Sequence, residues 1–179
     1  MLKKIIVVDP GHGGNDPGAL GKKSNEKTLT LNIAKALKAE LEKAGYRVIL
    51  TRGRDAYVSL GMRCLIANNA KANFFLSIHA NSAVDNTASG VEVLYKRDDL
   101  KDEAEQLAKD ISVAMGFKNR GAKYRNDLYV LNGTRMPSLL VEVGFISNPA
   151  EEEKLLTNVA KIAQVIAARL RKFDAFKSL

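Results

Sequence analysis

The sequence predicts a single α/β domain over residues 1–179, built on a twisted, mostly parallel or mixed sheet of about six strands with helices on both faces. Short, apolar, β-branched runs alternate along the chain with longer segments whose apolar residues recur at helical spacing. Such alternation favours parallel strands that are covered by helices. With 179 residues, 46% of them hydrophobic, the chain can bury a sizeable core and is too apolar to be disordered.

The first half of the chain predicts three strands and two helices. The expected strands are residues 5–8, 46–50 and 74–78. The expected helices run from a cap at Ser24 or Asn25 to Lys43, and from a cap at Ser59 to Asn69. Asp-Pro-Gly ends the first strand abruptly, and Gly45 ends the first helix.

The second half predicts further strands and helices with one unclear segment between them. The expected strands are residues 90–95 and 138–143, and the expected helices are residues 99–115 and one or two from the Asn148 cap to Phe173. Residues 118–133 carry the weakest pattern, within which we expect a strand at residues 127–131.

The composition narrows the possible partners but leaves the compartment open, because a single cysteine fits both a reducing cytosol and a bacterial exterior. A net charge of +8 favours an anionic partner, but the absence of tryptophan argues against a stacking platform for single-stranded nucleic acid. No apolar run approaches the roughly 20 residues that a bilayer span needs. The single cysteine, Cys64, cannot form an internal disulfide, and we expect it to be a buried side chain.

Four polar side chains are predicted to meet at one edge of the sheet. His12, His79 and Glu142 each lie at or just beyond the end of an apolar strand, and the ends of parallel strands share an edge. Glu26 lies in the first turn of the helix after the first strand, and this helix begins at the same edge. Glu26 also shares a helix face with Ile33, where a carboxylate needs a partner.

Each of these residues also has an ordinary structural explanation when taken singly. His12 could be a loop histidine beside glycines, and His79 a hydrogen-bonded core histidine. Glu26 could complement the helix dipole, and Glu142 could pair with a buried lysine or arginine. Their coincidence favours chemistry, because His12 and His79 are the two histidines of the chain and occupy the same kind of position.

Two imidazoles and one carboxylate form a catalytic zinc set with the fourth position open for water. The second carboxylate would then be free to act as base and acid. The helical zinc-protease pattern His-Glu-x-x-His is absent, so such a site has to be assembled from distant segments.

Four motifs occur in order along the chain. They are Asp-Pro-Gly-His-Gly-Gly with Asp-Pro-Gly-Ala at residues 9–19, Glu26 with the helix at 28–34, Ser-Ile-His-Ala-Asn at 77–81, and Val-Glu-Val-Gly-Phe-Ile-Ser-Asn at 141–148. Together they resemble the bacterial zinc-dependent N-acetylmuramoyl-L-alanine amidases over nearly the whole chain. Residues 51–52 with Asp55, and Arg63, also fit the resemblance, and we interpret them as structural ion pairs and caps.

By this resemblance, His12, Glu26 and His79 bind Zn²⁺ and Glu142 is the catalytic acid and base. The substrate would be peptidoglycan, cut at the amide between the lactyl group of N-acetylmuramic acid and L-alanine of the stem peptide. Zinc would polarise the carbonyl and acidify its water, and Glu142 would pass the proton to the leaving amine. Asp9 or another nearby acid could orient a ligating histidine.

The resemblance also implies an extracellular place of action. We expect a secreted, monomeric, autolysin-like enzyme of the cell wall, acting in lysis, remodelling or daughter-cell separation, with anionic wall polymers as partners of its positive charge. The first eight residues are too short for a signal-peptide core, and wall-binding repeats are absent. We therefore expect a catalytic domain cut from a longer protein, without the inserted helix that blocks the zinc in some relatives.

Two rival functions remain at this stage. A zinc carboxypeptidase-like hydrolase would use the same metal set. A basic α/β binding module would use Asp-Pro-Gly-His-Gly-Gly as an anion-binding loop, but it leaves Glu26 and Glu142 unexplained. We expect no nucleic-acid partner, no membrane span and no cofactor other than the metal.

Overall fold

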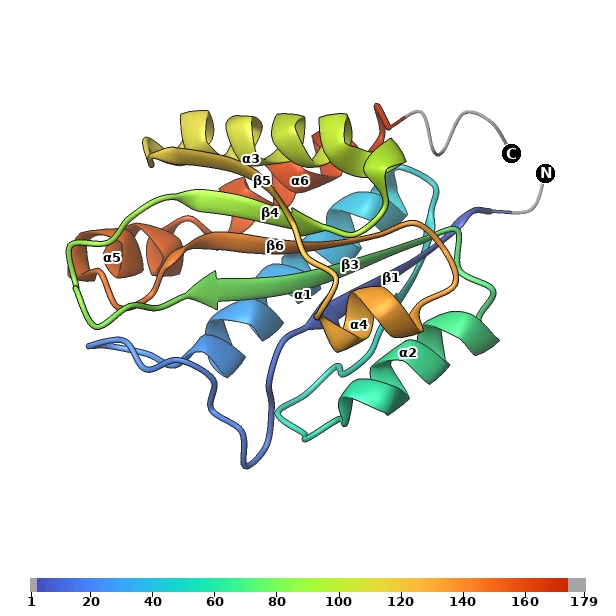
Figure 1. Ribbon diagram of the computed structural model, residues 1–179. Helices are drawn as coiled ribbons and strands as arrows, with labels where there is room; N and C mark the ends of the chain where they lie inside the picture. Colours follow the sequence, from blue (N-terminus) through green and yellow to red (C-terminus); the bar gives the residue numbers. More distant parts are fainter. Residues whose placement is uncertain (1–2, 174–179) are drawn as a thin grey trace.

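The computed structural model describes residues 3–173, which form one six-stranded sheet with the order β2-β1-β3-β6-β4-β5 (Figure 1). The strands are β1 (Ile5–Pro10), β2 (Arg47–Leu50), β3 (Phe74–Asn81), β4 (Val91–Tyr95), β5 (Asn119–Tyr124) and β6 (Ser138–Phe145). The pairs β1–β2, β1–β3, β3–β6 and β4–β5 are parallel, and β4–β6 is antiparallel. The predicted mixed, mostly parallel sheet is therefore confirmed.

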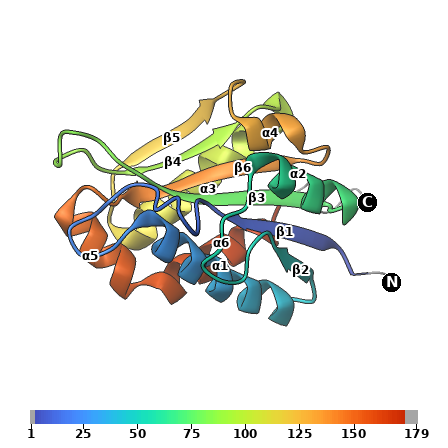
Figure 2. The same cartoon turned by 90° about the horizontal axis from the view of Figure 1, so that it is seen from below.

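Helices cover the two faces of this sheet unequally. The helices are α1 (Glu26–Lys43), α2 (Leu60–Asn69), η1 (Asp98–Leu100), α3 (Lys101–Met115), α4 (Tyr129–Gly133), α5 (Pro149–Thr157) and α6 (Val159–Leu170). The thick layer, made of α1, α3 and α6, packs on one face, and the thin layer, made of α2 and α4, packs on the other (Figures 1 and 2). Among the residues the structure describes, no helix is long and apolar enough to cross a membrane.

Alternate residues of each strand serve the two layers, as the two-residue period of a strand requires. On β3, Leu76 and Ile78 are buried under the thick layer, whereas Phe75 packs under the thin layer. Cys64 on α2 belongs to the thin-layer core, where it is buried as predicted. The thin layer covers only one end of its sheet face, so no helix within residues 3–173 covers the other end, where β3 and β6 finish (Figure 1).

Capping residues and glycines in the sequence predicted most helix ends correctly. Asn25, Ser59 and Asn148 act as N-caps through side chains that accept hydrogen bonds from backbone N–H groups of the first turn. Gly116 ends α3 in the left-handed conformation, with a φ of 64°. The region after the Asn148 cap, predicted to hold one or two helices, holds two, α5 and α6, which meet at Asn158.

The segment between α3 and β6 differs from the expectation. The predicted strand at residues 127–131 is wrong, because α4 begins at Tyr129 and buries Val130 and Leu131 in the thin-layer core. The strand lies instead at Asn119–Tyr124, where β5 forms the edge of the sheet. An edge strand that pairs on one side and stays largely exposed lacks the apolar run that identifies a buried strand.

Candidate metal centre

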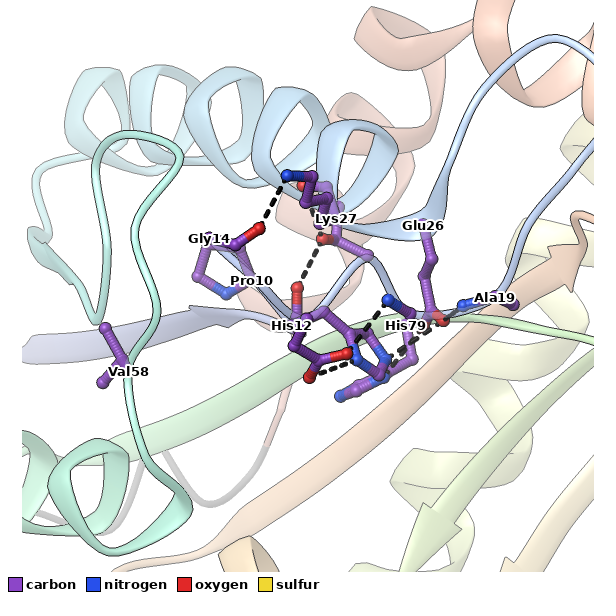
Figure 3. A network of polar contacts seen from close by, with 12 residues as sticks. Pro10, His12, Gly14, Ala19, Glu26, Lys27, Val58 and His79 are labelled. Atoms are coloured by element: carbon purple, nitrogen blue, oxygen red, sulfur yellow. Dashed lines mark hydrogen bonds and ion pairs between the residues drawn. The ribbon is translucent and has the colours of Figure 1, made fainter.

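His12, Glu26 and His79 meet at the end of the sheet that the thin layer leaves open (Figure 3). Glu26 Oε2 lies 3.0 Å from His12 Nε2, and Glu26 Oε1 lies 2.9 Å from His79 Nδ1. The three ligand atoms all lie within 4.8 Å of one another. The structure therefore brings together the three residues that the sequence analysis named as ligands, from a loop, a helix start and a strand.

Glycines give these three side chains the space to meet. The chain leaves β1 at Pro10, and the N–H of Gly11 donates to Ile78 O at 2.9 Å, which ties the loop to β3. A Cβ atom on Gly11 would lie 2.4 Å from the ring of His79. A Cβ atom on Gly18 would lie 2.6 Å from the ring of His12 and 2.7 Å from Glu26 Oε2. The glycine-rich loop is therefore a steric requirement of the cluster.

Further contacts orient the cluster. His12 Nδ1 lies 2.9 Å from Asp16 Oδ2, so that the other nitrogen of the ring, Nε2, faces Glu26. Glu26 accepts hydrogen bonds from the backbone N–H groups of Ala19 at 2.9 Å and Ala80 at 3.0 Å. Asp16 is thus the nearby acid that holds a histidine of the cluster. Its position four residues after His12 in a turn-rich loop is the sequence signal that could have identified it.

Asp9 does not contact either histidine. Its buried carboxylate accepts from Arg63 Nη1 at 2.8 Å, Thr51 Oγ1 at 2.5 Å and Ser77 Oγ at 2.7 Å. Arg63 also donates to the backbone oxygens of Pro10, His12 and Val58. The interpretation of Arg63 and Thr51 as structural residues is confirmed, and Asp9 belongs to the same support beneath the loop.

The loop that follows β2 makes hydrogen bonds to both segments that carry His12 and Glu26. Arg52 Nη2 donates to the backbone oxygens of Gly11 and Lys27, both at 2.8 Å. Asp55 accepts from the N–H of Gly14 at 2.7 Å and from Lys27 Nζ at 2.8 Å. These contacts hold the His12 loop against the first turn of α1, and they confirm the structural interpretation of Arg52 and Asp55.

The electrostatics of the cluster favour a positive charge at its centre. Burial lowers the pKa of His12 and of His79. The hydrogen bonds and charge of Glu26, together with Asp16 at His12 and the charge of Glu142 at His79, outweigh it, so both histidine pKa values are raised above 6.5. Burial raises the pKa of Glu26, but its bonds to His12 and His79 lower it well below the usual range. The carboxylate therefore attracts protons onto the histidines, and a cation would compete for the same place.

Glu142 lies next to the cluster on β6, where it is the register partner of His79 on β3. Its Oε2 atom is buried and has no hydrogen-bond partner among the described residues. Burial, together with the charges of Glu26 and Glu92 and against the opposing charge of His79, raises its pKa to about 7. A carboxyl group of this kind can both accept and release a proton near neutral pH.

The donor set suits Zn²⁺. In the part of the chain that the structure describes, His12, Glu26 and His79 form the one group of metal-ligating side chains with ligand atoms this close. Two imidazole nitrogens and one carboxylate oxygen are ligands that zinc prefers, and three protein ligands leave a fourth position open. The unpartnered, buried Oε2 of Glu142 beside them is compatible with a further group bound at this place.

An apolar cavity of about 390 Å³ opens beside the two histidines. It is lined by the strand ends and the loop around the two histidines, by the loop before α2, by α2 and by the α4 region. Its aromatic and aliphatic walls include Tyr57, Val58, Leu60, Leu128, Tyr129 and Val130. The sequence analysis missed this cavity, because its residues come from several separate segments and one of them, around α4, was predicted as a strand.

Comparisons with known proteins agree with this geometry. The family model described as N-acetylmuramoyl-L-alanine amidase matches residues 6–172. The probable cell wall amidase LytH of Staphylococcus saprophyticus is 40% identical over 178 residues, which cover 97% of this chain and 59% of the relative. The chain thus spans about three fifths of the length of this relative and of two LytH relatives from Staphylococcus epidermidis.

Solved structures show the same similarity. The catalytic domain of CwlV, an N-acetylmuramoyl-L-alanine amidase from Bacillus (Paenibacillus) polymyxa, is 38% identical with a TM-score of 0.88, covering 94% of this chain and 97% of that one. An N-acetylmuramoyl-L-alanine amidase from Clostridium difficile 630 is 34% identical with a TM-score of 0.89, covering 98% of both chains.

Proposed function

The chain belongs to the N-acetylmuramoyl-L-alanine amidase family, and from this premise we propose that it hydrolyses peptidoglycan with the help of zinc. The bond cut is the amide between the lactyl group of N-acetylmuramic acid and L-alanine of the stem peptide. The observation that carries this proposal is the unpartnered, buried Oε2 of Glu142 beside the cluster of His12, Glu26 and His79.

The cluster would hold the metal through His12 Nε2, a carboxylate oxygen of Glu26 and His79 Nδ1. Zn²⁺ bound there supplies Lewis-acid chemistry, which polarises the scissile carbonyl and makes a water molecule more acidic. Asp16 keeps the ring of His12 in the orientation that directs Nε2 inward. The backbone N–H groups of Ala19 and Ala80 hold Glu26 in the same way.

Glu142 moves the proton. Its Oε2 accepts a proton from the attacking water while a C–O bond forms at the carbonyl carbon. The same carboxyl then donates that proton to the nitrogen as the C–N bond breaks. The products are the lactyl carboxylic acid on the sugar and a new amino-terminal alanine on the stem peptide. A pKa raised to about 7 suits both halves of this transfer.

The domain is proposed to act at the cell wall, outside the cell, as a secreted monomer in lysis, remodelling or daughter-cell separation. Its relatives include proteins named as probable cell wall amidases, and its net charge of +8 suits anionic wall polymers. Exposed charges are screened by salt beyond about 8 Å at physiological ionic strength. Binding to intact walls should therefore weaken as salt rises, whereas turnover of a small soluble muropeptide should change less. An equal effect of salt on both would contradict the role of the charge.

The test of the proposed function is a product analysis with the purified protein. Peptidoglycan treated with the zinc-loaded protein should gain amino-terminal alanine, and chelation followed by zinc addition should abolish and restore this gain. Release of a carboxy-terminal amino acid instead would identify a carboxypeptidase. Retention on DNA together with no zinc and no hydrolysis would identify a binding module.

A further inference from the structure

The apolar cavity beside His12 and His79 is part of the open site. His12 and His79 themselves line it, so a group bound in the cavity lies next to the proposed reaction centre. Its volume of about 390 Å³ is in the range of pockets that take a small ligand. Proton transfer by Glu142 does not explain this cavity, because Glu142 is not among its lining residues.

The charged residues of the cavity have their hydrogen-bonding groups occupied. Arg63 and Asp9 are bonded to each other and to the surrounding loop, and both are buried. Asp16 binds His12 with one oxygen and accepts from the N–H of Gly18 with the other. The guanidinium of Arg63 is therefore not free to bind an anionic ligand, and the Asp16 carboxylate at the side of the cavity repels one. Away from the histidines, the cavity thus favours an uncharged group over the anionic part of a stem peptide.

The surface that remains is aromatic and aliphatic. Tyr57 and Tyr129 are 61% and 55% exposed, and Leu60 beside them is 53% exposed. Both tyrosines pack against glycines of neighbouring segments, which limits their movement. Tyr57 packs so closely on Gly14 of the glycine-rich His12 loop that a Cβ on Gly14 would lie 2.6 Å from the backbone nitrogen of Tyr57. The hydroxyl of Tyr129 lies over Gly61 at the start of α2. Tyrosine rings of this kind provide rigid, amphipathic contact area.

The direction of proton transfer assigns the two halves of the substrate to two sides of the site. Glu142 has to reach the leaving nitrogen, so the stem peptide lies on its side, towards β6 and β4. The acyl half, which is the lactyl group with its sugar, then lies on the side of the histidines where the cavity opens. An uncharged sugar ring with an acetyl methyl group matches the aromatic and aliphatic walls.

We propose that this cavity binds the N-acetylmuramoyl sugar of the substrate, with Tyr129 and Tyr57 packing on the ring or its acetyl group. The proposal rests on the proposed amidase function and adds the residues that select the acyl side. The sugar keeps its contacts from ground state to transition state, so removing a contact should raise KM more than it lowers kcat.

The experiment compares two soluble substrates with the same peptide, one carrying the N-acetylmuramoyl group and one carrying a D-lactoyl group without the sugar. The zinc-loaded wild-type protein should prefer the first by about tenfold or more in kcat/KM, the size of one good apolar contact. Tyr129→Ala should bring this ratio close to one, mainly through KM, and Tyr129→Phe should keep it. Tyr124→Ala is the matched control, because Tyr124 is 54% exposed on β5 and does not line the cavity.

A second measurement does not depend on turnover. Binding of the uncharged primary amide of N-acetylmuramic acid to the zinc-loaded protein, followed by NMR, should weaken about tenfold in Tyr129→Ala and stay unchanged in Tyr124→Ala. Equal cleavage of both substrates by the wild type would overturn the cavity assignment and leave the amidase function standing. Failure to cleave either substrate would overturn the amidase function, and the binding measurement would then decide the cavity assignment separately. Equal losses in Tyr129→Ala for both substrates would show a structural role and overturn it as well.

Discussion

The two faces of the sheet use the same strands for opposite purposes. Under the thick layer, Leu76 and Ile78 of β3 are fully buried in a core that α1, α3 and α6 share. On the other face of the same strand, Phe75 is covered by the thin layer, Ser77 binds the support residue Asp9, and His79 reaches the metal cluster. Along this one strand, the side chains on the thin-layer face thus belong first to the hydrophobic core, then to the hydrogen-bonded support of the loop, and finally to the candidate metal centre.

This difference shows how the fold makes room for chemistry. The two short helices of the thin layer cover only one end of their sheet face. The polar residues of the candidate metal centre lie just beyond the end of this layer. The thick layer supplies the apolar burial that holds the strands at fixed spacing, so the thin face can carry unsatisfied polar atoms such as Glu142 Oε2. The predictions below test this separation of stability from function.

The largest effect is expected at the acid–base residue. Glu142→Gln should lower kcat about 10²–10⁴-fold, because an amide cannot accept the proton of the water, while the two histidines and Glu26 still bind zinc. His79→Ala should instead lose both zinc and activity. Metal content and release of amino-terminal alanine, measured on each purified variant, separate the two roles.

The control for that pair is Glu42→Gln, an exposed substitution on α1 at a residue paired with Lys38, and it should change neither quantity. Loss of zinc from Glu142→Gln as complete as from His79→Ala would make Glu142 a ligand. Near-normal turnover in Glu142→Gln would mean that another residue is the base.

Ile78, the neighbour of His79 on the opposite face of β3, should affect the stability of the fold and not the binding of zinc. Ile78→Ala removes a fully buried side chain from the thick-layer core and should lower the free energy of unfolding by about 2–5 kcal/mol. The folded fraction should still bind one zinc ion per chain, because the backbone that carries His79 is held on both sides by β1 and β6. Chemical denaturation and metal analysis of Ile78→Ala and His79→Ala check this. A stoichiometric loss of zinc from folded Ile78→Ala would contradict the separation of the two faces.

Most of the fold could be predicted because its signals are local. Asn25, Ser59, Gly116 and Asn148 mark helix ends with side-chain or backbone chemistry of their own. The failure at α4 has a physical cause as well. Leu128, Val130 and Leu131 follow no clear helical period over five residues, and only their packing against α2 selects a helix. In such short segments tertiary contacts outweigh local preference.

The site was predictable as a set of residues but not as a geometry. The chain has two histidines, and their positions at strand ends placed both at one edge of a parallel sheet. That Asp16 and not Asp9 contacts His12 depends on how the glycine-rich loop turns, with His12 itself at a φ of 61°. The cavity could not be predicted, because it needs the packing of α2 against α4.

The role of Asp16 as an outer support gives an intermediate effect. Asp16→Asn keeps the shape but removes the charge beside His12 Nδ1, and zinc affinity should fall about 10–100-fold. Asp85→Asn, at an exposed aspartate that bonds only within its own turn, is the matched control and should not change it. Competition with a chelator of known affinity measures both. Equal affinities for Asp16→Asn and the wild type would show that the contact does not orient the ligand.

The remaining effect, and the one that tests the electrostatics directly, is the dependence of zinc binding on pH. Glu26 raises the pKa values of His12 and His79 above 6.5 despite their burial, so in the metal-free protein the histidines hold protons to a higher pH than usual. Zinc has to displace these protons, and its affinity should therefore rise with pH by up to about tenfold per unit for each proton released. The pKa of Glu26 is lowered, so its carboxylate does not compete above about pH 5.

The metal-free protein should show the opposite trend. Histidines whose folded pKa is raised stabilise the fold below the unfolded value of about 6.5, and this contribution is lost as pH rises through the folded pKa. Titration calorimetry in buffers of different ionisation enthalpy counts the protons released on zinc binding, and denaturation of the metal-free protein from pH 5 to 9 follows the stability. Zinc binding that releases no protons at pH 6 would contradict the assignment of His12 and His79 as ligands, because protonated imidazoles cannot bind a metal without losing them.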